Sequence, residues 1–218
     1  MMKESELVEK VRQTINEADD DSAVTLLTPD RRSFDDNIKR LLPRAVAFVQ
    51  KNKQAMARVN VKAATPSAVP VVGSGNGVGY IVLPADFVSP VSLSIVGWKQ
   101  PCTKFYSTRS HRALLQRGKD TRAGFFRPVC VEDVTPDGAR CVRLYPLPQG
   151  SAAVVGNFVY EATYNAAEGL GICDAAMADA VVYECAALLY TMFERFDTAN
   201  MYHSLALSLC GGNNMQKR

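Results

Sequence analysis

Residues 79–101 read Gly-Tyr-Ile-Val-Leu-Pro-Ala-Asp-Phe-Val-Ser-Pro-Val-Ser-Leu-Ser-Ile-Val-Gly-Trp-Lys-Gln-Pro, and they hold two apolar runs typical of strands. The runs are joined by a corner, Leu83-Pro84-Ala85-Asp86-Phe87. The proline disfavours a helical conformation at Leu83. We expect Asp86 to accept hydrogen bonds from nearby backbone amides and Phe87 to anchor the next strand in the core. This stretch predicts architecture and presents no reactive group.

The β-rich part of the chain extends on both sides of this corner, because hydrophobicity alternates with a period of two from residue 78 to about 164. Turn signals at Asn76-Gly77 and Thr135-Pro136-Asp137-Gly138 favour antiparallel hairpins. An interruption at 107–118 is long enough for a short helix. The strands that we expect are 78–83, 88–98, 124–132, 139–146 and 153–164.

Helical periodicity marks both ends of the chain. Apolar residues recur with a 3.6-residue period in 5–17 and again from Ser33 to 51, and an Asp174-initiated run continues through 196 before a second helix to 209. The predicted fold is α+β, with the N- and C-terminal helices (5–51 and 174–209) packed as a helical bundle and a β-rich antiparallel middle. We expect a single domain, 1–218, in which about 58–164 is a β-rich insertion.

The bulk composition fits an ordinary globular protein. Of 218 residues, 47% are hydrophobic and 22% charged, and the net charge is +3. The N-terminus has no apolar segment typical of a signal peptide, so we expect the six cysteines to be free and mostly buried in a reducing cytoplasm. The most apolar window, near 175–193, contains Asp179 and Glu184, so no membrane span is expected.

Known catalytic patterns are missing from the sequence. Only two histidines occur, His111 and His203, and no nucleophile-elbow, zinc-protease or P-loop motif is present. The glycine-rich run 73–79 lacks the spacing and the following helix of a dinucleotide cradle, so we interpret it as a hairpin tip. We therefore expect no enzyme activity, no catalytic residues, no metal site and no cofactor.

Charge is unevenly distributed. The basic segment, Lys99–Arg127, holds eight cations against Asp120 alone, a net of +7, whereas residues 1–36 hold ten acids against five cations, a net of −5. Three interpretations stay open: a solvated loop, a surface that faces phosphates non-specifically, or a head-to-tail contact between copies of the chain. The aromatic residues bordering this segment are interpreted as core anchors of its strands and not as base-stacking platforms; they are Phe105, Tyr106, Phe125 and Phe126. Trp98 is likewise expected to be a core or interface anchor.

The order of several motifs resembles a known family. The chain has an amphipathic N-terminal helix, then Ser33-Phe34-Asp35-Asp36-Asn37-Ile38-Lys39-Arg40-Leu41-Leu42-Pro43-Arg44-Ala45, then Gly79-Tyr80-Ile81-Val82-Leu83-Pro84-Ala85-Asp86-Phe87 leading to Gly97-Trp98-Lys99-Gln100-Pro101. It closes with an Asp174-initiated helix ending Leu188-Leu189-Tyr190-Thr191-Met192-Phe193-Glu194. Over about residues 5–196 this is similar to the head-to-tail adaptor, or connector, ring proteins of tailed bacteriophages, and it is most similar to those of crAss-like phages.

The resemblance implies a structural virion protein without catalytic residues. It implies a ring, commonly of twelve copies, that is made in the host bacterial cytoplasm and resides at the head–tail junction of the virion. Such a ring binds the portal protein, continues the DNA channel with non-specific contact to passing DNA, and presents a docking surface to other tail or ring proteins. The alternative function is a nucleic-acid-binding accessory protein that uses the basic segment.

Two sets of contact residues follow from these expectations. The candidates for DNA-channel or inter-subunit contacts are Lys104, Arg109, Arg112, Arg117, Lys119 and Arg122. Adaptors of this family often hold the portal with a terminal segment, and the residues here that would do so are Gly211, Gly212, Asn213, Asn214, Lys217 and Arg218.

Overall fold

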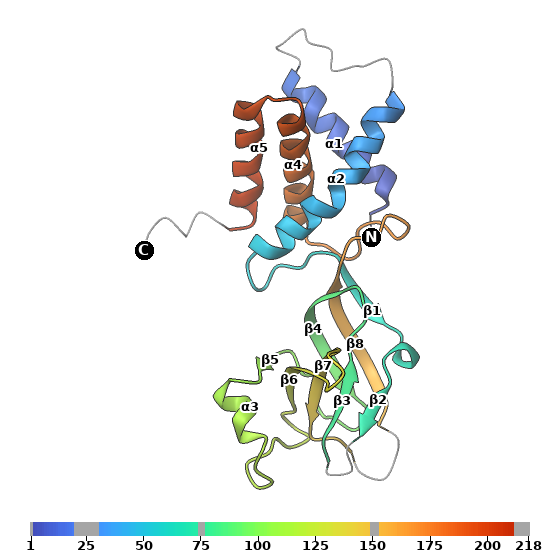
Figure 1. Cartoon of the computed structure of the whole chain (residues 1–218), viewed down its shortest axis with the longest axis vertical. Coiled ribbons are helices and arrows are strands. Elements are labelled where there is room, and N and C mark those ends of the chain that lie inside the picture. The colour runs from blue at the N-terminus through green and yellow to red at the C-terminus, as the bar shows by residue number, and fades with distance from the viewer. Residues whose placement is uncertain (1, 20–30, 74–76, 149–152, 212–218) are drawn as a thin grey trace. The chain divides into compact units, whose positions relative to one another are not determined.

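The computed structural model describes residues 2–19, 31–73, 77–148 and 153–211. The chain forms two compact units: a helical unit made of Met1–Val61 with Thr163–Arg218, and a β unit made of Lys62–Ala162 (Figure 1). The predicted α+β class with a β-rich middle and terminal helices is confirmed. The β unit begins and ends close to the expected insertion boundaries, 58 and 164. That the whole chain behaves as one domain stays a prediction.

The helical unit contains α1 (Glu4–Asp19), α2 (Arg31–Asn52), α4 (Ala175–Met192) and α5 (Phe196–Leu209). Helix α4 contacts each of the other three. Burial follows the expected periodicity, since α1 buries Leu7, Val8, Val11 and Ile15 along one face. Helix α4 is long and apolar enough to cross a membrane, with a mean hydropathy of 1.3, but 61% of it is buried, as is typical of the central helix of a bundle.

Helix ends differ from the sequence expectations in detail. Helix α1 begins at Glu4, where the Glu6 carboxylate accepts the Lys3 backbone N–H at 3.0 Å, and Ser33 lies inside α2. The break before α5 occurs at Glu194, which has a φ of +59°, so α4 ends at Met192 and not at the expected 196. Asp174 is the N-cap residue of α4 as expected, but its carboxylate accepts the backbone N–H of Arg58 at 2.8 Å. That bond ties the start of α4 to a distant segment.

The β unit contains two sheets. The first has the order β1 (Val61–Ala64), β8 (Val155–Ala162), β4 (Phe87–Ile95), and the second has the order β2 (Val71–Gly73), β3 (Gly79–Val82), β7 (Arg140–Tyr145), β6 (Val129–Val134), β5 (Phe105–Ser107). One buried cluster draws on both sheets, with Leu93 and Phe158 from the first and Ile81 and Val142 from the second. A short 3₁₀ turn, η1 (Pro66–Ala68), follows β1.

Strand direction departs from the expectation at one pair. Strands β2–β3, β3–β7, β6–β7 and β4–β8 pair antiparallel, but β5 pairs with β6 in parallel, in the register Phe105↔Cys130. The middle is therefore mixed and not purely antiparallel. Parallel neighbours require a crossover connection, and here that connection runs from 108 to 128, through most of the basic segment.

The Thr135–Gly138 turn expected from the sequence is confirmed, and the two strands flanking the other expected turn pair antiparallel. Strands β2 and β3 pair in the register Gly73↔Gly79, which makes them a hairpin, and Gly77 has a φ of +68°. Asn76, the other residue of the predicted turn, lies outside the described residues. Between β6 and β7, the Thr135 carbonyl accepts the Gly138 N–H at 2.9 Å and Gly138 has a φ of +84°. Left-handed backbone at these positions explains why glycine is present.

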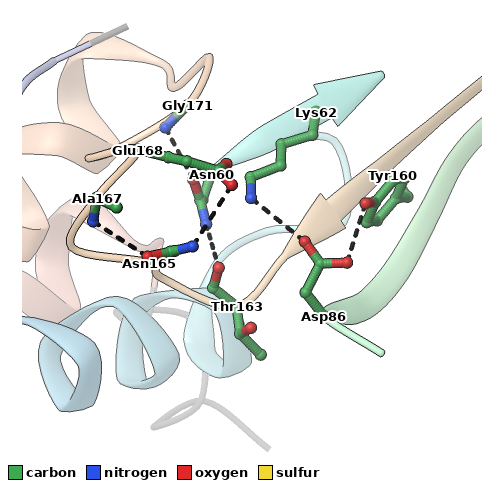
Figure 2. A network of polar contacts seen from close by, with 9 residues as sticks. All are labelled: Asn60, Lys62, Asp86, Tyr160, Thr163, Asn165, Ala167, Glu168 and Gly171. Carbon is green, nitrogen blue, oxygen red and sulfur yellow. Dashed lines mark hydrogen bonds and ion pairs between the residues drawn. The ribbon is translucent and has the colours of Figure 1, made fainter. Parts of the chain in front are cut away.

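The Leu83–Phe87 corner enters β4. Phe87 is 6% exposed and its ring stacks on Phe158 and Tyr160, so its predicted role as a core anchor is confirmed. The expectation for Asp86 is wrong: its carboxylate receives the Lys62 ammonium at 3.2 Å and the Tyr160 hydroxyl at 3.0 Å, two side chains distant in sequence (Figure 2). The Lys62 ammonium adds a full opposite charge, which a backbone amide cannot supply to this carboxylate.

Candidate functional site

The basic segment lies mainly in the crossover between β5 and β6. The Ser110 side chain accepts the backbone N–H of Ala113 and so caps α3 (His111–Leu115). This confirms the short helix expected within 107–118. Ala113 is the buried residue of this helix, so one side of α3 is fixed against the unit while Arg112 stays exposed.

The buried side chain of Gln116 links separate parts of the crossover by hydrogen bonds. It is 2% exposed, and its side-chain oxygen accepts the backbone N–H of Ala123 at 2.8 Å. Its side-chain nitrogen donates to the Arg112 carbonyl at 3.0 Å, and its own backbone carbonyl accepts the Arg122 Nε at 3.3 Å. Thr121 closes the same loop by donating its hydroxyl to the Leu115 carbonyl. The loop is therefore braced around the buried Gln116 side chain, whose polar atoms would cost free energy if left unbonded.

The braced crossover presents most of its cations to solvent. Lys104 precedes β5, Arg112 lies on α3, and the other candidates lie in the turns around them. The side chains classed as exposed are Lys99, Lys104, Arg109, Arg112, Arg117, Lys119 and Arg127, while Arg122 is half-buried. Among the described residues, Arg109, Arg112, Arg117 and Lys119 pair with no carboxylate. The structure therefore places Arg109, Arg112, Arg117 and Lys119 on one connection, where none of the four pairs with a described carboxylate.

The interpretation of two aromatic residues is wrong. Strand β6 begins at Val129 and not near 124, so Phe125 and Phe126 lie in the preceding turn and are 40% and 71% exposed. Phe105 and Tyr106 are partly buried against the core clusters, as expected of strand anchors. The sequence alone does not distinguish the two pairs, because each consists of two adjacent aromatic residues next to a cation.

Trp98 anchors the adjacent turn. Its indole N–H donates to the Pro146 carbonyl at 2.8 Å and its ring packs against the buried cluster of the β unit, so the predicted anchor role is confirmed. The next residue, Lys99, donates its backbone N–H to the Phe125 carbonyl at 3.0 Å. This bond joins the 97–101 turn to the crossover and places Lys99 beside the exposed aromatic residues.

Buried thiols lie beneath the start of the segment. All six cysteines are free and five are buried, which confirms the sequence expectation. Cys102 donates its thiol to the Lys104 carbonyl at 3.3 Å. A hydrogen bond with Cys130 lowers the pKa of Cys102, whereas burial raises the pKa of Cys130 well above its ordinary value. These contacts fix the backbone from which Lys104 projects.

The second set of candidates lies at the C-terminus. Gly211 follows the C-cap of α5 with a φ of +83°, and a Cβ there would come within 2.3 Å of the Gln54 side chain. Gly211 therefore has a structural reason to be glycine. The other expected portal contacts, Gly212, Asn213, Asn214, Lys217 and Arg218, lie outside the described residues.

The two histidines lie in different environments. His111 is exposed on α3, whereas Nδ1 of His203 contacts the Glu184 carboxylate at 2.8 Å and its ring lies 4.9 Å from Phe48. Glu184 is 4% exposed. No group of three metal-ligating side chains occurs among the residues that the structure describes. The Glu184–His203 pair is best explained as a partly buried polar link between α4 and α5.

Glu184→Gln is expected to remove a pH dependence of stability. Burial raises the pKa of Glu184 above 4.5 in the folded chain, against the opposing effect of His203. The folded state therefore holds this proton more tightly than the unfolded state, and stability falls as pH rises from 4.5 through the folded pKa. Urea denaturation across this pH range should show the free energy of unfolding of the variant rising relative to that of the native chain as pH increases. A difference that is constant with pH would contradict this.

No protein-family model matches the chain, and no curated protein matches its sequence. We therefore infer function from the basic segment, whose backbone is braced and several of whose exposed cations pair with no described carboxylate.

Proposed function

We propose that this protein is a structural subunit of a head-to-tail adaptor ring at the head–tail junction of a tailed bacteriophage. The observation that carries the proposal is the basic segment: a β unit inserted between terminal helices holds it on a braced crossover with its cations exposed. The motif order of the resembled family supports the same assignment. No step of this role requires catalysis.

In a closed ring, every copy repeats the same crossover. Exposed cations spaced around a lumen attract the DNA backbone without reading its sequence. Each contact stays weak, since exposed charges interact through water and are screened beyond about 8 Å at physiological salt. Such a surface supports the passage of DNA without holding it tightly, which a channel requires.

Contact between neighbouring copies is the other use of the same charge. A ring needs two complementary side faces, and the acidic residues of 1–36 are one candidate for the second face. Arg12 already pairs with Asp35 at 2.9 Å and with Glu9 at 3.5 Å inside the helical unit. Those two carboxylates are therefore partly neutralised, and the DNA-facing role of the basic segment is favoured over the inter-subunit role.

Assembly with the portal tests the proposal. Purified protein mixed with the phage portal should form a ring complex, seen by mass photometry and negative-stain imaging. Deleting residues 212–218 should weaken portal binding while leaving the helical circular dichroism signal unchanged. A chain that stays monomeric and never binds the portal would overturn the proposal.

The uncompensated cations also favour a second candidate, a nucleic-acid-binding accessory protein. Replacing Arg112 and Arg117 together with alanine should reduce duplex DNA binding and lower the salt slope of log K by roughly two. The matched control is the double replacement of Arg40 and Arg44, two exposed arginines on α2. Fluorescence anisotropy at two salt concentrations measures both. Equal effects of the two double variants would contradict a specific role of the basic segment.

A further inference from the structure

We propose that the turn 124–127 is a binding site for single-stranded nucleic acid, with an unpaired base stacking on the Phe126 ring. This goes beyond the adaptor role and deepens the second candidate function, on which it rests for its electrostatic attraction. Phe126 is 71% exposed, and Phe125 beside it is 40% exposed. The two are adjacent, and an exposed apolar patch rimmed by polar or charged residues can mark an interaction site.

The aromatic turn is held in a fixed conformation. The Arg127 N–H donates to the Gly124 carbonyl at 3.1 Å, which closes the turn around the two phenylalanines. The Phe125 carbonyl accepts the Lys99 N–H at 3.0 Å, and Gln116 holds the preceding Ala123. The Phe126 ring is thus presented on a backbone fastened at both ends, so little conformational entropy is lost when a ligand covers it.

Cationic residues flank this turn along the chain and through one backbone bond. Arg127 follows it directly, Lys99 is joined to the neighbouring residue by the backbone bond above, and Arg122 lies two residues before Gly124. The only carboxylate of the whole segment is Asp120. An aromatic face beside a positively charged groove is the combination by which proteins bind single strands without sequence preference, the cations following the phosphates and the ring stacking on a base.

The chemistry of Phe126 favours unpaired bases over the other anionic partners. In a duplex the faces of the bases are covered by their neighbours, so the ring has no π surface to meet. A lipid surface rewards apolar area of any shape, and an acidic peptide offers charge without a flat π partner. A single strand supplies both phosphates for the cations and a flat π surface for the exposed ring, so we favour it as the occupant.

Anisotropy titration of the full chain with labelled oligothymidylate at low salt tests the proposal. Phe126→Ala should weaken this binding roughly tenfold, the range of one stacked base, while leaving binding of a duplex of equal length unchanged. Phe126→Trp should retain or strengthen it. Phe126→Leu should behave like Phe126→Ala, because leucine keeps apolar area but offers no aromatic face.

The matched control is Phe196→Ala, which removes an aromatic side chain that is 59% exposed at the start of α5, outside the basic segment. This variant should bind oligothymidylate like the native chain. An equal loss in both alanine variants would overturn the assignment of the site to Phe126.

The remaining outcomes separate this inference from the functions on which it rests. If duplex binding falls in the Arg112 and Arg117 variant but oligothymidylate binding is insensitive to Phe126, the stacking site is wrong and the cationic surface stands. A third outcome is that the native chain binds vesicles that contain phosphatidylserine but does not bind oligothymidylate. If Phe126→Leu then binds these vesicles as tightly as the native chain, the turn is a lipid contact and the proposal is overturned. Ring assembly with the portal is unaffected by either result.

Discussion

Replacing Asn60 with alanine is expected to lower the free energy of unfolding of the helical unit by about 3–5 kcal/mol. Asn60 is fully buried and has a φ of +54°, a conformation that a side chain with a Cβ adopts at a cost unless it bonds locally. Its side-chain oxygen accepts the Gly171 N–H at 2.8 Å and its side-chain nitrogen donates to the Thr163 carbonyl at 3.0 Å (Figure 2). Alanine keeps the unfavourable backbone conformation and removes both hydrogen bonds, so the Gly171 N–H and the Thr163 carbonyl each lose a partner.

Urea denaturation followed by the helical circular dichroism signal measures this loss. Asn60→Gly relieves the left-handed backbone but not the lost bonds, so it should be less destabilised than Asn60→Ala by about 1 kcal/mol. Asn60→Asp keeps the acceptor and loses the donor to Thr163, so it reports the second bond. If alanine and glycine are both within about 0.5 kcal/mol of the native chain, the usual range for a surface substitution, the bridging role is wrong.

Periodicity was sufficient to predict the larger elements. The 3.6-residue period of α1 and the alternation in β3 each reflect burial of one face, which is a property of local sequence. Strand β5 was not predicted, because it is three residues long and its pairing partner is set by a parallel crossover. Asn60 was missed for a similar reason: its role depends on Thr163 and Gly171, more than a hundred residues away.

The candidate site was predicted in part. A count of charges was enough to find the basic segment, since uncompensated charge is visible without a structure. The brace at Gln116 was not predicted, because a buried glutamine has no periodic signature and its partners are backbone groups. Phe126 was assigned to the core on residue type alone. Pro128, inside the predicted strand 124–132, is the signal for its exposure: proline is confined to strand ends and edges, which places the start of β6 after it.

Phe87→Ala is expected to destabilise the β unit by about 3–5 kcal/mol, the usual cost of removing a buried phenylalanine. The Phe87 ring lies 6.2 Å from Phe158 and 5.9 Å from Tyr160, and the Arg140 guanidinium lies 4.9 Å from its centroid. The corner that opens β4 delivers this ring into the core, so its loss empties space beside both sheets. Trp98 is the only tryptophan and lies in the β unit, so its fluorescence during urea denaturation reports this unit.

Two further variants separate packing from aromatic contact. Phe87→Leu keeps most of the buried volume but loses the ring stacking and the cation–π contact, and should cost about 1–2 kcal/mol. Phe126→Ala removes the same atoms from a position that is 71% exposed, and surface substitutions of this kind change stability by about 0.5 kcal/mol or less. If Phe87→Ala and Phe126→Ala were equally destabilising, burial at the corner would not be the source of the effect. A Phe87→Leu variant as unstable as Phe87→Ala would instead place the stabilisation in the stack with Phe158 and Tyr160 and in the Arg140 contact.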